Sequence, residues 1–361
     1  MIEEGEVKIE ITDFKQYKGP GKKKAGFYNP TLEIDRDINV IFCQYIANKG
    51  AKKMLDGLSA TGIRGIRIAK EVKSIDVHIN DINPASYEII RENVKKNKVN
   101  VKIFCENIHS LLLKEKYDYV DIDPYGSPVP FISCVFKGLK RKGYASFTAT
   151  DTATLCGIYK KACIRRYHAL PLRGQAMKEI GLRILIGYIA RQATTFEYGL
   201  RPILSYVYGH FFRIYARLEK GARKADETFS KIGWIFWKNG WRISSFDRLP
   251  TPPFAGPLWI GKLHEKNFLN EMEKIMTEKK LGRKKEIEKM LRIFKEEETL
   301  PPLFYESRYI SKEMKAKQPK LISIIEKLRR KGYDAGRTHF MPDAFKTNAP
   351  YDEIKKLFLN Q

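Results

Sequence analysis

One stretch of the sequence carries residue types that could perform chemistry on a nucleobase. Residues 116–131 read KYDYVDIDPYGSPVPF, an apolar run that leads into Asp123, Pro124 and Tyr125. Proline cannot continue a sheet ladder, so we expect a strand that ends here and exposes the residues after it. The Asp123 carboxylate and the Pro124 carbonyl can accept hydrogen bonds from an exocyclic amino group, and the Tyr125 ring can stack on the base. The alternative interpretation is an Asp-Pro turn with an aromatic side chain on the surface.

Acidic residues also follow three other predicted strands. Asp56, Asp81 and Glu106 each come after a short apolar run, as Asp123 does. Ligands of open α/β sheets bind at the carboxyl ends of the strands, so these residues predict one acidic cleft. Helix capping after a strand explains any one of these acids. It explains four in succession poorly.

A loop of small residues follows the first of these strands. Residues 56–62 read DGLSATG, so Asp56, Ser59, Thr61 and Gly62 form the predicted cofactor cradle, although the dinucleotide pattern GxGxxG is absent. About twenty residues further on, the carboxylate of Asp81 can take both hydroxyls of a ribose.

The acids also indicate which cofactor such a cleft would bind. Glu106 and Asn107 could reach the edge of an adenine. Phosphates would be repelled by the carboxylates, whereas the sulfonium of S-adenosyl-L-methionine is a cation. The pattern therefore favours a nucleoside cofactor without phosphates.

The surrounding pattern alternates strands with helices. Strands are predicted at 54–55, 77–79, 101–105, 117–122 and 144–150, and helices at 63–72, 85–96 and 129–139. This alternation predicts an α/β fold, with a mostly parallel sheet covered by helices on both faces. After a long helix at 175–193, two alternating segments at 203–208 and 211–218 predict a terminal antiparallel hairpin.

A polar break at 220–226 predicts a domain boundary. We expect one domain at 1–223 and a smaller α+β domain at 224–361. The smaller domain is predicted to contain a tryptophan-rich strand and turn at 233–241, helices at 265–276, 284–295 and 319–330, and a short strand at 337–340. This order fits either a winged-helix nucleic-acid reader or an α+β docking domain.

The charge of the chain predicts a polyanionic partner. The formal net charge is +25 and the pI is about 9.7, so nucleic acid is the leading candidate. Three consecutive lysines in the Gly/Pro-rich stretch 17–24 fit phosphate contact and a solvated loop equally well.

Cysteine usage and hydropathy set further expectations. The five cysteines include no CxxC pair, which indicates neither a zinc site nor a disulfide framework and fits buried thiols in a reducing cytosol. Residues 1–8 do not resemble a signal peptide, and no apolar run reaches the about 18 residues of a membrane span. We therefore expect a cytoplasmic protein without a membrane contact, and nothing in the sequence indicates a protein partner.

These motifs support a resemblance to a known family. The pattern resembles class I S-adenosylmethionine-dependent methyltransferases, which have a Rossmann-like domain whose sheet ends in an antiparallel hairpin, and DPYG is similar to their D/N-P-P-Y/F motif. Nearly end to end, the chain resembles the tRNA guanine-26 N2-methyltransferases. The similar stretches are GFYNP (26–30), DRD (35–37), LDGLSATGIRGIR (55–67), DIDPYGSPVPF (121–131), TDTATLCG (150–157), RRYHALPLRGQAMKEIGLRILI (165–186), GPLWIG (256–261) and RTHF (337–340).

The resemblance implies roles for individual residues. Asp123, with the carbonyl of Pro124, would be the catalytic acceptor, and Phe27 and Tyr125 would flank the target base. The cofactor would be S-adenosyl-L-methionine and the partner tRNA. The implied cofactor-binding residues are Arg36 at the methionine carboxylate, Asp56, Ser59, Thr61, Gly62 and Arg64 in and after the cradle, Asp81 and Ile82 at the ribose, and Glu106 and Asn107 at the adenine. No metal is expected, because the chain lacks the cysteine pairs that bind zinc near 233–241 in some relatives.

Two other functions fit parts of the pattern. The DPYG motif alone also permits an adenine N6-methyltransferase or a ribosomal guanine N2-methyltransferase. A non-catalytic RNA-binding protein would explain the basic charge, but it has no use for Asp81 and Asp123 facing a polyanion.

Overall fold

A seven-stranded sheet forms the centre of the fold. The computed structural model describes residues 1–11 and 25–359, so the predicted basic loop at 17–24 lies outside the described residues. The strand order is β5-β4-β3-β6-β7-β9-β8, and the pairs among β3, β4, β5, β6 and β7 are parallel. The strands are β3 (Lys53–Asp56), β4 (Asp76–Asn80), β5 (Lys102–Phe104), β6 (Tyr117–Ile122), β7 (Leu139–Ala149), β8 (Tyr198–Tyr208) and β9 (Phe211–Lys220). Because two residues join β8 to β9, these strands run in opposite directions, which confirms the predicted sheet with its terminal hairpin.

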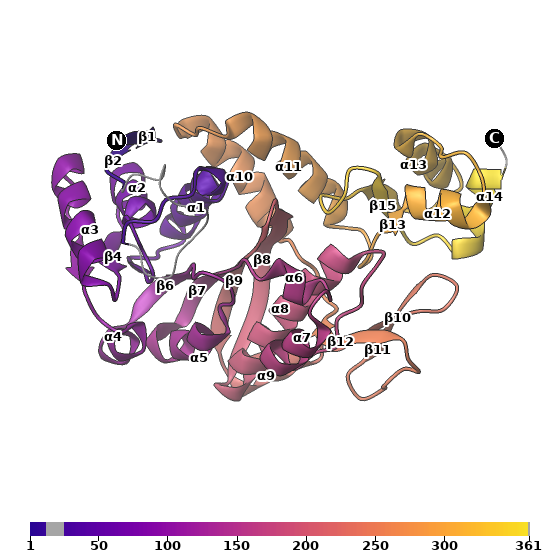
Figure 1. Cartoon of the computed structure of the whole chain (residues 1–361), viewed down its shortest axis with the longest axis horizontal. Helices are drawn as coiled ribbons and strands as arrows, with labels where there is room; N and C mark the ends of the chain where they lie inside the picture. Colours follow the sequence, from indigo (N-terminus) through magenta and orange to yellow (C-terminus); the bar gives the residue numbers. More distant parts are fainter. Residues whose placement is uncertain (12–24, 360–361) are drawn as a thin grey trace. The chain divides into compact units, whose positions relative to one another are not determined.

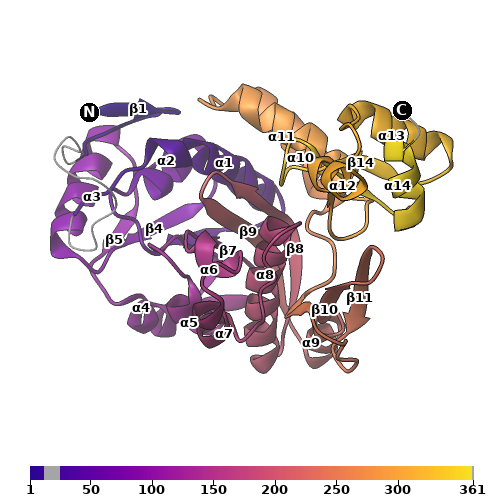
Figure 2. The same ribbon diagram turned by 45° about the vertical axis from the view of Figure 1, so that its right-hand side comes forward.

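Helices cover both faces of the parallel strands. Helices α1 and α2 lie on one side, and α4 and α5 lie on the other (Figures 1 and 2). The first half of the chain contains β1 (Ile2–Glu4), β2 (Val7–Ile9), the 3-10 turn η2 (Pro30–Leu32), α1 (Glu33–Asn48), α2 (Ile63–Glu71), α3 (Pro84–Asn97), α4 (Ile108–Lys114) and α5 (Val129–Gly138). In the part of the chain that the structure describes, no helix combines the length and the apolar content of a membrane span.

Contacts divide the chain into two compact units, each made of three segments. The first unit contains Met1–Ala149, Tyr215–Lys220 and Asn267–Lys289, and the second contains Thr150–Ile214, Gly221–Lys266 and Met290–Gln361. A late segment therefore helps to build the first unit. Phe268 of α10 (Lys266–Glu278) packs its ring 5.7 Å from that of Phe42 on α1, and the Arg283 amide donates to Asp37 Oδ2 over 2.8 Å.

Helices α1 and α2 are joined by buried charges. Asp35 pairs with Arg64 over 2.8 Å, and Asp37 pairs with Arg67 over 2.7 Å. Arg36, between these two aspartates, donates from Nε and Nη2 to the two oxygens of Glu4 over 2.7 and 2.6 Å. Removing one partner of a buried pair leaves an uncompensated charge and is strongly destabilising. The DRD segment therefore fixes the position of α2 relative to α1.

Asn80 connects three loops at the carboxyl edge of the sheet. Its side-chain amide donates to the carbonyls of Gly57 and Glu106, each over 3.1 Å, and its Oδ1 accepts from the Glu106 amide over 3.1 Å. Its own carbonyl accepts from the Ser59 amide over 3.0 Å. One buried asparagine thus sets the spacing of the loops after β3, β4 and β5.

The second unit contains two small antiparallel sheets, of order β11-β10-β12 and β13-β15-β14. The β10-β11 turn at 238–240 agrees with the turn predicted in the tryptophan-rich stretch. The remaining elements are α6 (Thr152–Leu155), α7 (Lys160–Tyr167), α8 (Met177–Thr195), α9 (Ala222–Phe229), β10 (Ile232–Trp237), β11 (Trp241–Ser245), β12 (Phe254–Trp259), α11 (Lys284–Glu297), β13 (Tyr305–Glu306), α12 (Ser307–Met314), α13 (Leu321–Arg330), β14 (Ala335–Arg337), β15 (Ala344–Thr347) and α14 (Tyr351–Leu359).

The end of the chain has the connectivity of a winged helix. Strand β13 is followed by α12 and α13 and then by the β14-β15 pair, and β15 lies between β13 and β14 in the sheet. This is one of the two alternatives that the sequence left open. The strand predicted at 337–340 is wrong in position, since β14 ends at Arg337 and the side chains of Thr338 and His339 bond to Glu297 instead.

We expect Gly65→Ala to destabilise the protein, because α2 packs closely on β4. A Cβ at this position would lie 2.6 Å from Ile79 Cγ1 and 3.3 Å from Asp56 Oδ2. Overpacking of this kind costs about 1–3 kcal/mol, which outweighs the helix propensity that alanine gains. Urea unfolding would measure the change, with Lys70→Ala on the exposed face of α2 as the control. Equal unfolding free energies for Gly65→Ala and the wild type would contradict the close packing.

Candidate active site

The carboxylates predicted from the sequence lie at one edge of the sheet, in the first compact unit. Asp56 ends β3, Asp81 follows β4, Glu106 follows β5 and Asp123 follows β6. Because these four strands are parallel neighbours, their carboxyl ends meet.

The Asp123 carboxylate is held by an ion pair with Arg64. Its Oδ2 accepts from Arg64 Nη2 over 2.6 Å, and the side chain is 18% exposed. Within residues 1–11 and 25–359, Oδ1 of Asp123 accepts no hydrogen bond. One oxygen is therefore fixed by the protein, while the other is available to a donor outside it.

An aromatic pair stands beside this carboxylate. The rings of Phe27 and Tyr125 meet edge to face, with centroids 5.0 Å apart, and Tyr125 is 42% exposed. Burial, with the nearby carboxylates of Asp81 and Asp123, raises the pKa of the Tyr125 phenol. The structure thus brings together all three predicted side chains, Asp123, Tyr125 and Phe27.

Hydrogen bonds between side chains and backbone hold the cradle after β3. Asp56 Oδ2 accepts from the Gly65 amide over 3.0 Å, and the Ser59 hydroxyl donates to the Asp56 carbonyl over 2.8 Å. The Thr61 side chain is buried, and Gly62 has φ +77°, which favours glycine at the start of α2. Burial, aided by the neighbouring Asp121 carboxylate and opposed by Arg64, raises the pKa of Asp56 to about 7.

Asp81 caps two backbone segments. Its Oδ2 accepts from the Ala60 amide over 2.8 Å and its Oδ1 from the Asn83 amide over 2.9 Å. Burial raises the pKa of Asp81, although both amides act against the shift. Ile82 beside it is 60% exposed.

The side chains predicted for the adenine and the methionine carboxylate have protein partners. Asn107 Oδ1 caps α4 through the His109 amide over 2.9 Å, and Glu106 pairs with Lys114 over 2.6 Å. Arg36 is buried against Glu4 and lies over the Tyr28 ring. Contact of these side chains with a cofactor remains a prediction.

Three residues of the site were missed by sequence reasoning. Asn80 spaces the loops, Asp35 contacts Arg64, and Asp121 Oδ2 accepts from the hydroxyls of Tyr119 and Ser146, each over 2.7 Å. The DRD and DIDPYG segments contain two of these residues, but only their partners, among them Arg64 and Ser146 at separations of 29 and 25 residues, reveal their roles.

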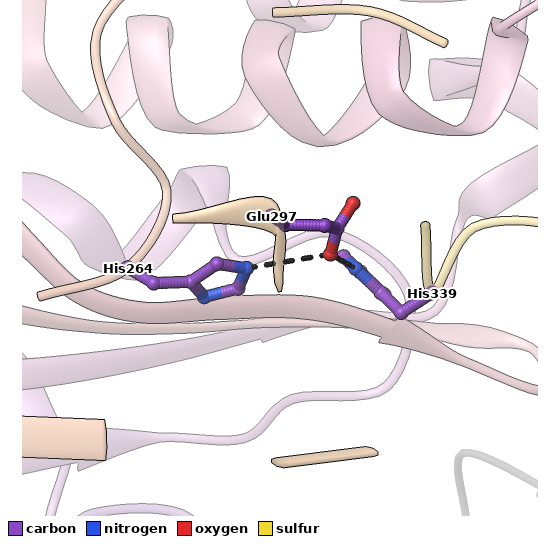
Figure 3. Close-up of side chains that lie close together, drawn as sticks. All are labelled: His264, Glu297 and His339. Carbon is purple, nitrogen blue, oxygen red and sulfur yellow. Dashed lines mark hydrogen bonds and ion pairs between the residues drawn. The ribbon is translucent and has the colours of Figure 1, made fainter. Parts of the chain in front are cut away.

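A second cluster of charged groups lies in the second unit. The ligand atoms of His264, Glu297 and His339 all lie within 4.8 Å of one another (Figure 3). Two histidines and a carboxylate are a common zinc ligand set, so this cluster is the candidate metal site of the described residues.

The hydrogen bonds of the cluster favour an ion-pair network over a metal site. His339 Nε2 accepts from the Val207 amide over 3.3 Å, which places the ring proton on Nδ1, where it is donated to Glu297. A metal bound to Nδ1 would move the ring proton to Nε2. The Nε2 proton and the Val207 amide proton would then face each other. In addition, Lys346 Nζ already provides a positive charge 3.4 Å from Glu297 Oε1 and 2.9 Å from Glu179 Oε1.

The electrostatics of this network are consistent with a structural role. Burial opposes ionisation of Glu297, yet His339 and Lys346 hold its pKa well below the usual range. Burial lowers the pKa of His264, whose Nε2 lies 3.7 Å from Glu297, too far for a hydrogen bond. A cavity of about 170 Å³, lined in part by His264, Glu297 and Lys346, adjoins the network. It is large enough for water to reach the His264 ring.

Comparisons with known proteins agree on one family. The family described as N2,N2-dimethylguanosine tRNA methyltransferase matches residues 5–358. A tRNA (guanine(26)-N(2))-dimethyltransferase of Pyrococcus horikoshii is 38% identical over 97% of this chain and 96% of its own, and one of Methanocaldococcus jannaschii is 37% identical over 98% and 97%. A solved structure of Trm1 from Pyrococcus horikoshii in complex with S-adenosyl-L-methionine has a TM-score of 0.90 at 37% identity, covering 98% of each chain.

We expect Lys346→Met to be strongly destabilising. The substitution leaves Glu179 and Glu297 without a shared buried cation, and the loss of one partner of such a network costs about 3–5 kcal/mol. Urea unfolding would measure the loss. The control is Lys356→Met, which removes an exposed lysine paired with Glu353 and costs at most about 1 kcal/mol. Similar losses for the two variants would rule out a structural role of the network.

We expect the stability of Asp56→Asn relative to the wild type to rise with pH. The pKa of Asp56 is about 7 in the folded protein, against an ordinary value of 3.8. Folded protein therefore keeps a proton that unfolded protein releases, so this stabilisation is complete below 3.8 and is lost as the pH rises through about 7. Asparagine resembles the protonated acid, so the variant does not lose this stability as the pH rises.

Unfolding free energies at pH 5, 6.5 and 8 would test this expectation. The difference between Asp56→Asn and the wild type should grow across the series, whereas the exposed Asp226→Asn should differ from the wild type by the same amount at each pH. A constant difference for Asp56→Asn would contradict the raised pKa.

Proposed function

From the premise that this chain belongs to the N2,N2-dimethylguanosine tRNA methyltransferase family, we propose that it methylates tRNA. It transfers one or two methyl groups from S-adenosyl-L-methionine to the N2 amino group of guanosine 26. The observation that carries the proposal is the position of Asp123 beside the Phe27–Tyr125 pair, with one carboxylate oxygen that no described residue engages. The names of the relatives, which cover nearly the whole chain, support the choice of substrate.

The residues of the cleft fit the proposed cofactor. Each oxygen of Asp81 accepts one amide and keeps a lone pair for a ribose hydroxyl, and the exposed Ile82 can cover the adenosine. Arg36 donates from Nε and Nη2 to protein oxygens, and its Nη1 has no partner in the described ranges, so it can take the methionine carboxylate. Asp56, Ser59, Thr61 and Gly62 would form the cradle, with Arg64 next to it and Glu106 and Asn107 near the adenine.

Asp123 would activate the amino group. The N2 lone pair of guanine is delocalised into the ring, which makes it a poor nucleophile. A hydrogen bond from N2 to Asp123 Oδ1, and a second to the Pro124 carbonyl, would localise the lone pair on nitrogen. When bound, S-adenosyl-L-methionine supplies an electrophilic methyl group on a positively charged sulfur. The amino group loses one proton for each methyl it gains, and Asp123 Oδ1 is the adjacent acceptor.

The same arrangement accommodates two rounds of transfer. A free amino group has two N–H bonds, and the first methylation leaves one of them. That remaining N–H can still donate to Asp123 Oδ1. One available carboxylate oxygen is therefore sufficient for both rounds.

Phe27 and Tyr125 would hold the target base. A base within a folded tRNA has to leave its stack to reach such a cleft, and unstacking costs a few kcal/mol. Contact with aromatic rings replaces part of the lost stacking, which is worth about 1–3 kcal/mol per base.

The region 224–361 would bind the body of the tRNA, as an α+β domain from which Asn267–Lys289 is set apart by packing in the first unit. Helix α13 of its winged-helix arrangement ends in the exposed Arg329 and Arg330, and the exposed Lys331 follows directly. A basic surface of this kind suits phosphate contacts. We also place the protein in the cytoplasm, together with its tRNA substrate.

The proposal is tested by methyl transfer from labelled S-adenosyl-L-methionine to an unmodified tRNA transcript, followed by nucleoside analysis. We expect label in N2-methylguanosine and N2,N2-dimethylguanosine, and a transcript with adenosine at position 26 should stay unlabelled. Asp123→Ala should slow transfer by about 10²–10⁴-fold.

Other outcomes would point to other functions. Label in a different nucleoside would support the proposed cofactor and contradict the proposed substrate. Salt-sensitive tRNA binding without any label would indicate a non-catalytic RNA-binding protein.

A further inference from the structure

We propose that Asp35 is a positioning residue for methyl transfer, acting through Arg64 on the carboxylate of Asp123. This inference rests on the proposed function, because it assigns a further residue to the same site. Neither the DPYG motif nor the cofactor cradle contains Asp35.

A single nitrogen connects the two aspartates. Nη2 of Arg64 carries two N–H bonds, and it donates to Asp35 Oδ2 over 2.8 Å and to Asp123 Oδ2 over 2.6 Å. The Asp35 side chain is fully buried, whereas that of Asp123 is 18% exposed. The guanidinium is therefore anchored on its buried side and presents its second N–H to the carboxylate at the cleft.

Asp35 is itself fixed by a second contact. The hydroxyl of Tyr215 on β9 donates to Asp35 Oδ1 over 3.1 Å. Both oxygens of Asp35 are thus engaged by side chains that come from different elements. The result is a chain of contacts from Tyr215 to Asp35, Arg64 and Asp123.

The orientation of the Asp123 carboxylate depends on this chain of contacts. Arg64 is its one hydrogen-bond partner within the described ranges, and no backbone amide among them binds its carboxylate. Without Asp35, the guanidinium can rotate toward Asp121, whose Oδ1 lies 3.7 Å from Arg64 Nε. Asp123 Oδ1 would then no longer be held where the amino group must meet it. A misplacement of about 1 Å can cost about 10²-fold in rate.

A matched control lies two residues away on the same helix. Asp37 is equally buried and pairs with Arg67 Nη1 over 2.7 Å. Arg67 also binds Glu4 and Glu71, and in the described part of the chain none of its contacts reaches Asp123. Asp35→Asn and Asp37→Asn therefore each remove one buried negative charge between α1 and α2, but only the first acts on the catalytic carboxylate.

The experiment measures single-turnover methyl transfer at saturating S-adenosyl-L-methionine and tRNA, together with the melting temperature of each variant. We expect Asp35→Asn to slow transfer about tenfold or more, while Asp37→Asn lowers the melting temperature but stays within about threefold of the wild-type rate. Equal losses of rate in the two variants would overturn the proposal.

Combining Asp35→Asn with Arg64→Lys separates positioning from general damage. If Asp35 acts through the guanidinium, the double variant should be as slow as Arg64→Lys alone, because residues that act as a unit are not additive. Multiplied losses would show that Asp35 acts by another route. Tyr215→Phe, which keeps the ring and removes one donor to Asp35, should slow transfer several-fold even if Asp35→Asn fails to fold. A wild-type rate for Tyr215→Phe would count against the chain of contacts.

The outcomes also separate this inference from the function on which it rests. A wild-type protein that methylates no tRNA would contradict both the proposed function and the role of Asp35. An active wild type with an equally active, folded Asp35→Asn would remove the role of Asp35 alone.

Discussion

Negative charge gathered at the end of a parallel sheet is the constraint around which the first unit is built. Four neighbouring strands end at one edge, and each brings a carboxylate to it. Buried or half-buried carboxylates need hydrogen-bond donors or cations, or they become protonated. Asp81 meets this need with backbone amides and Asp123 with Arg64, whereas Asp56 has a pKa of about 7. The differences among these solutions give each acid a different chemistry.

Buried arginines on α1 and α2 pair with carboxylates of the first unit, and Arg64 reaches Asp123 at the edge of the sheet. Arg36, Arg64 and Arg67 are all buried, and each is paired with at least one carboxylate. Buried ion pairs contribute little net stability, because desolvation offsets the attraction, but they define geometry well when every partner is present. Here the geometry supports the site. Arg64 fixes one oxygen of Asp123, and the other accepts no hydrogen bond from the described residues.

In the second unit, buried acids are also paired with a cation, but there the pairing serves packing. Its buried acids, Glu179 and Glu297, share Lys346, and Glu297 also accepts hydrogen bonds from Thr338 and His339. The two histidines first suggest a metal site, but the hydrogen bond from Val207 fixes the His339 tautomer that a metal would need to change. The RTHF segment therefore serves the packing of this unit.

Local pattern predicted the strands of the large sheet, the class of the fold and the carboxylates at the strand ends. Alternating apolar runs, small-residue loops and proline stops are short-range signals, and β6 was predicted at its true bounds. The sequence did not reveal short elements such as β13 and β15, nor β12, whose apolar run is broken by Gly256 and Pro257. It also did not reveal the partners of buried charges. Asp35 meets Tyr215, and Asp37 meets Arg283, over separations of 180 and 246 residues. Contacts of this kind have no local signature, because they arise only when packing excludes water and each charge must find a partner. The tertiary structure alone therefore decided how the carboxylate of Asp123 is held.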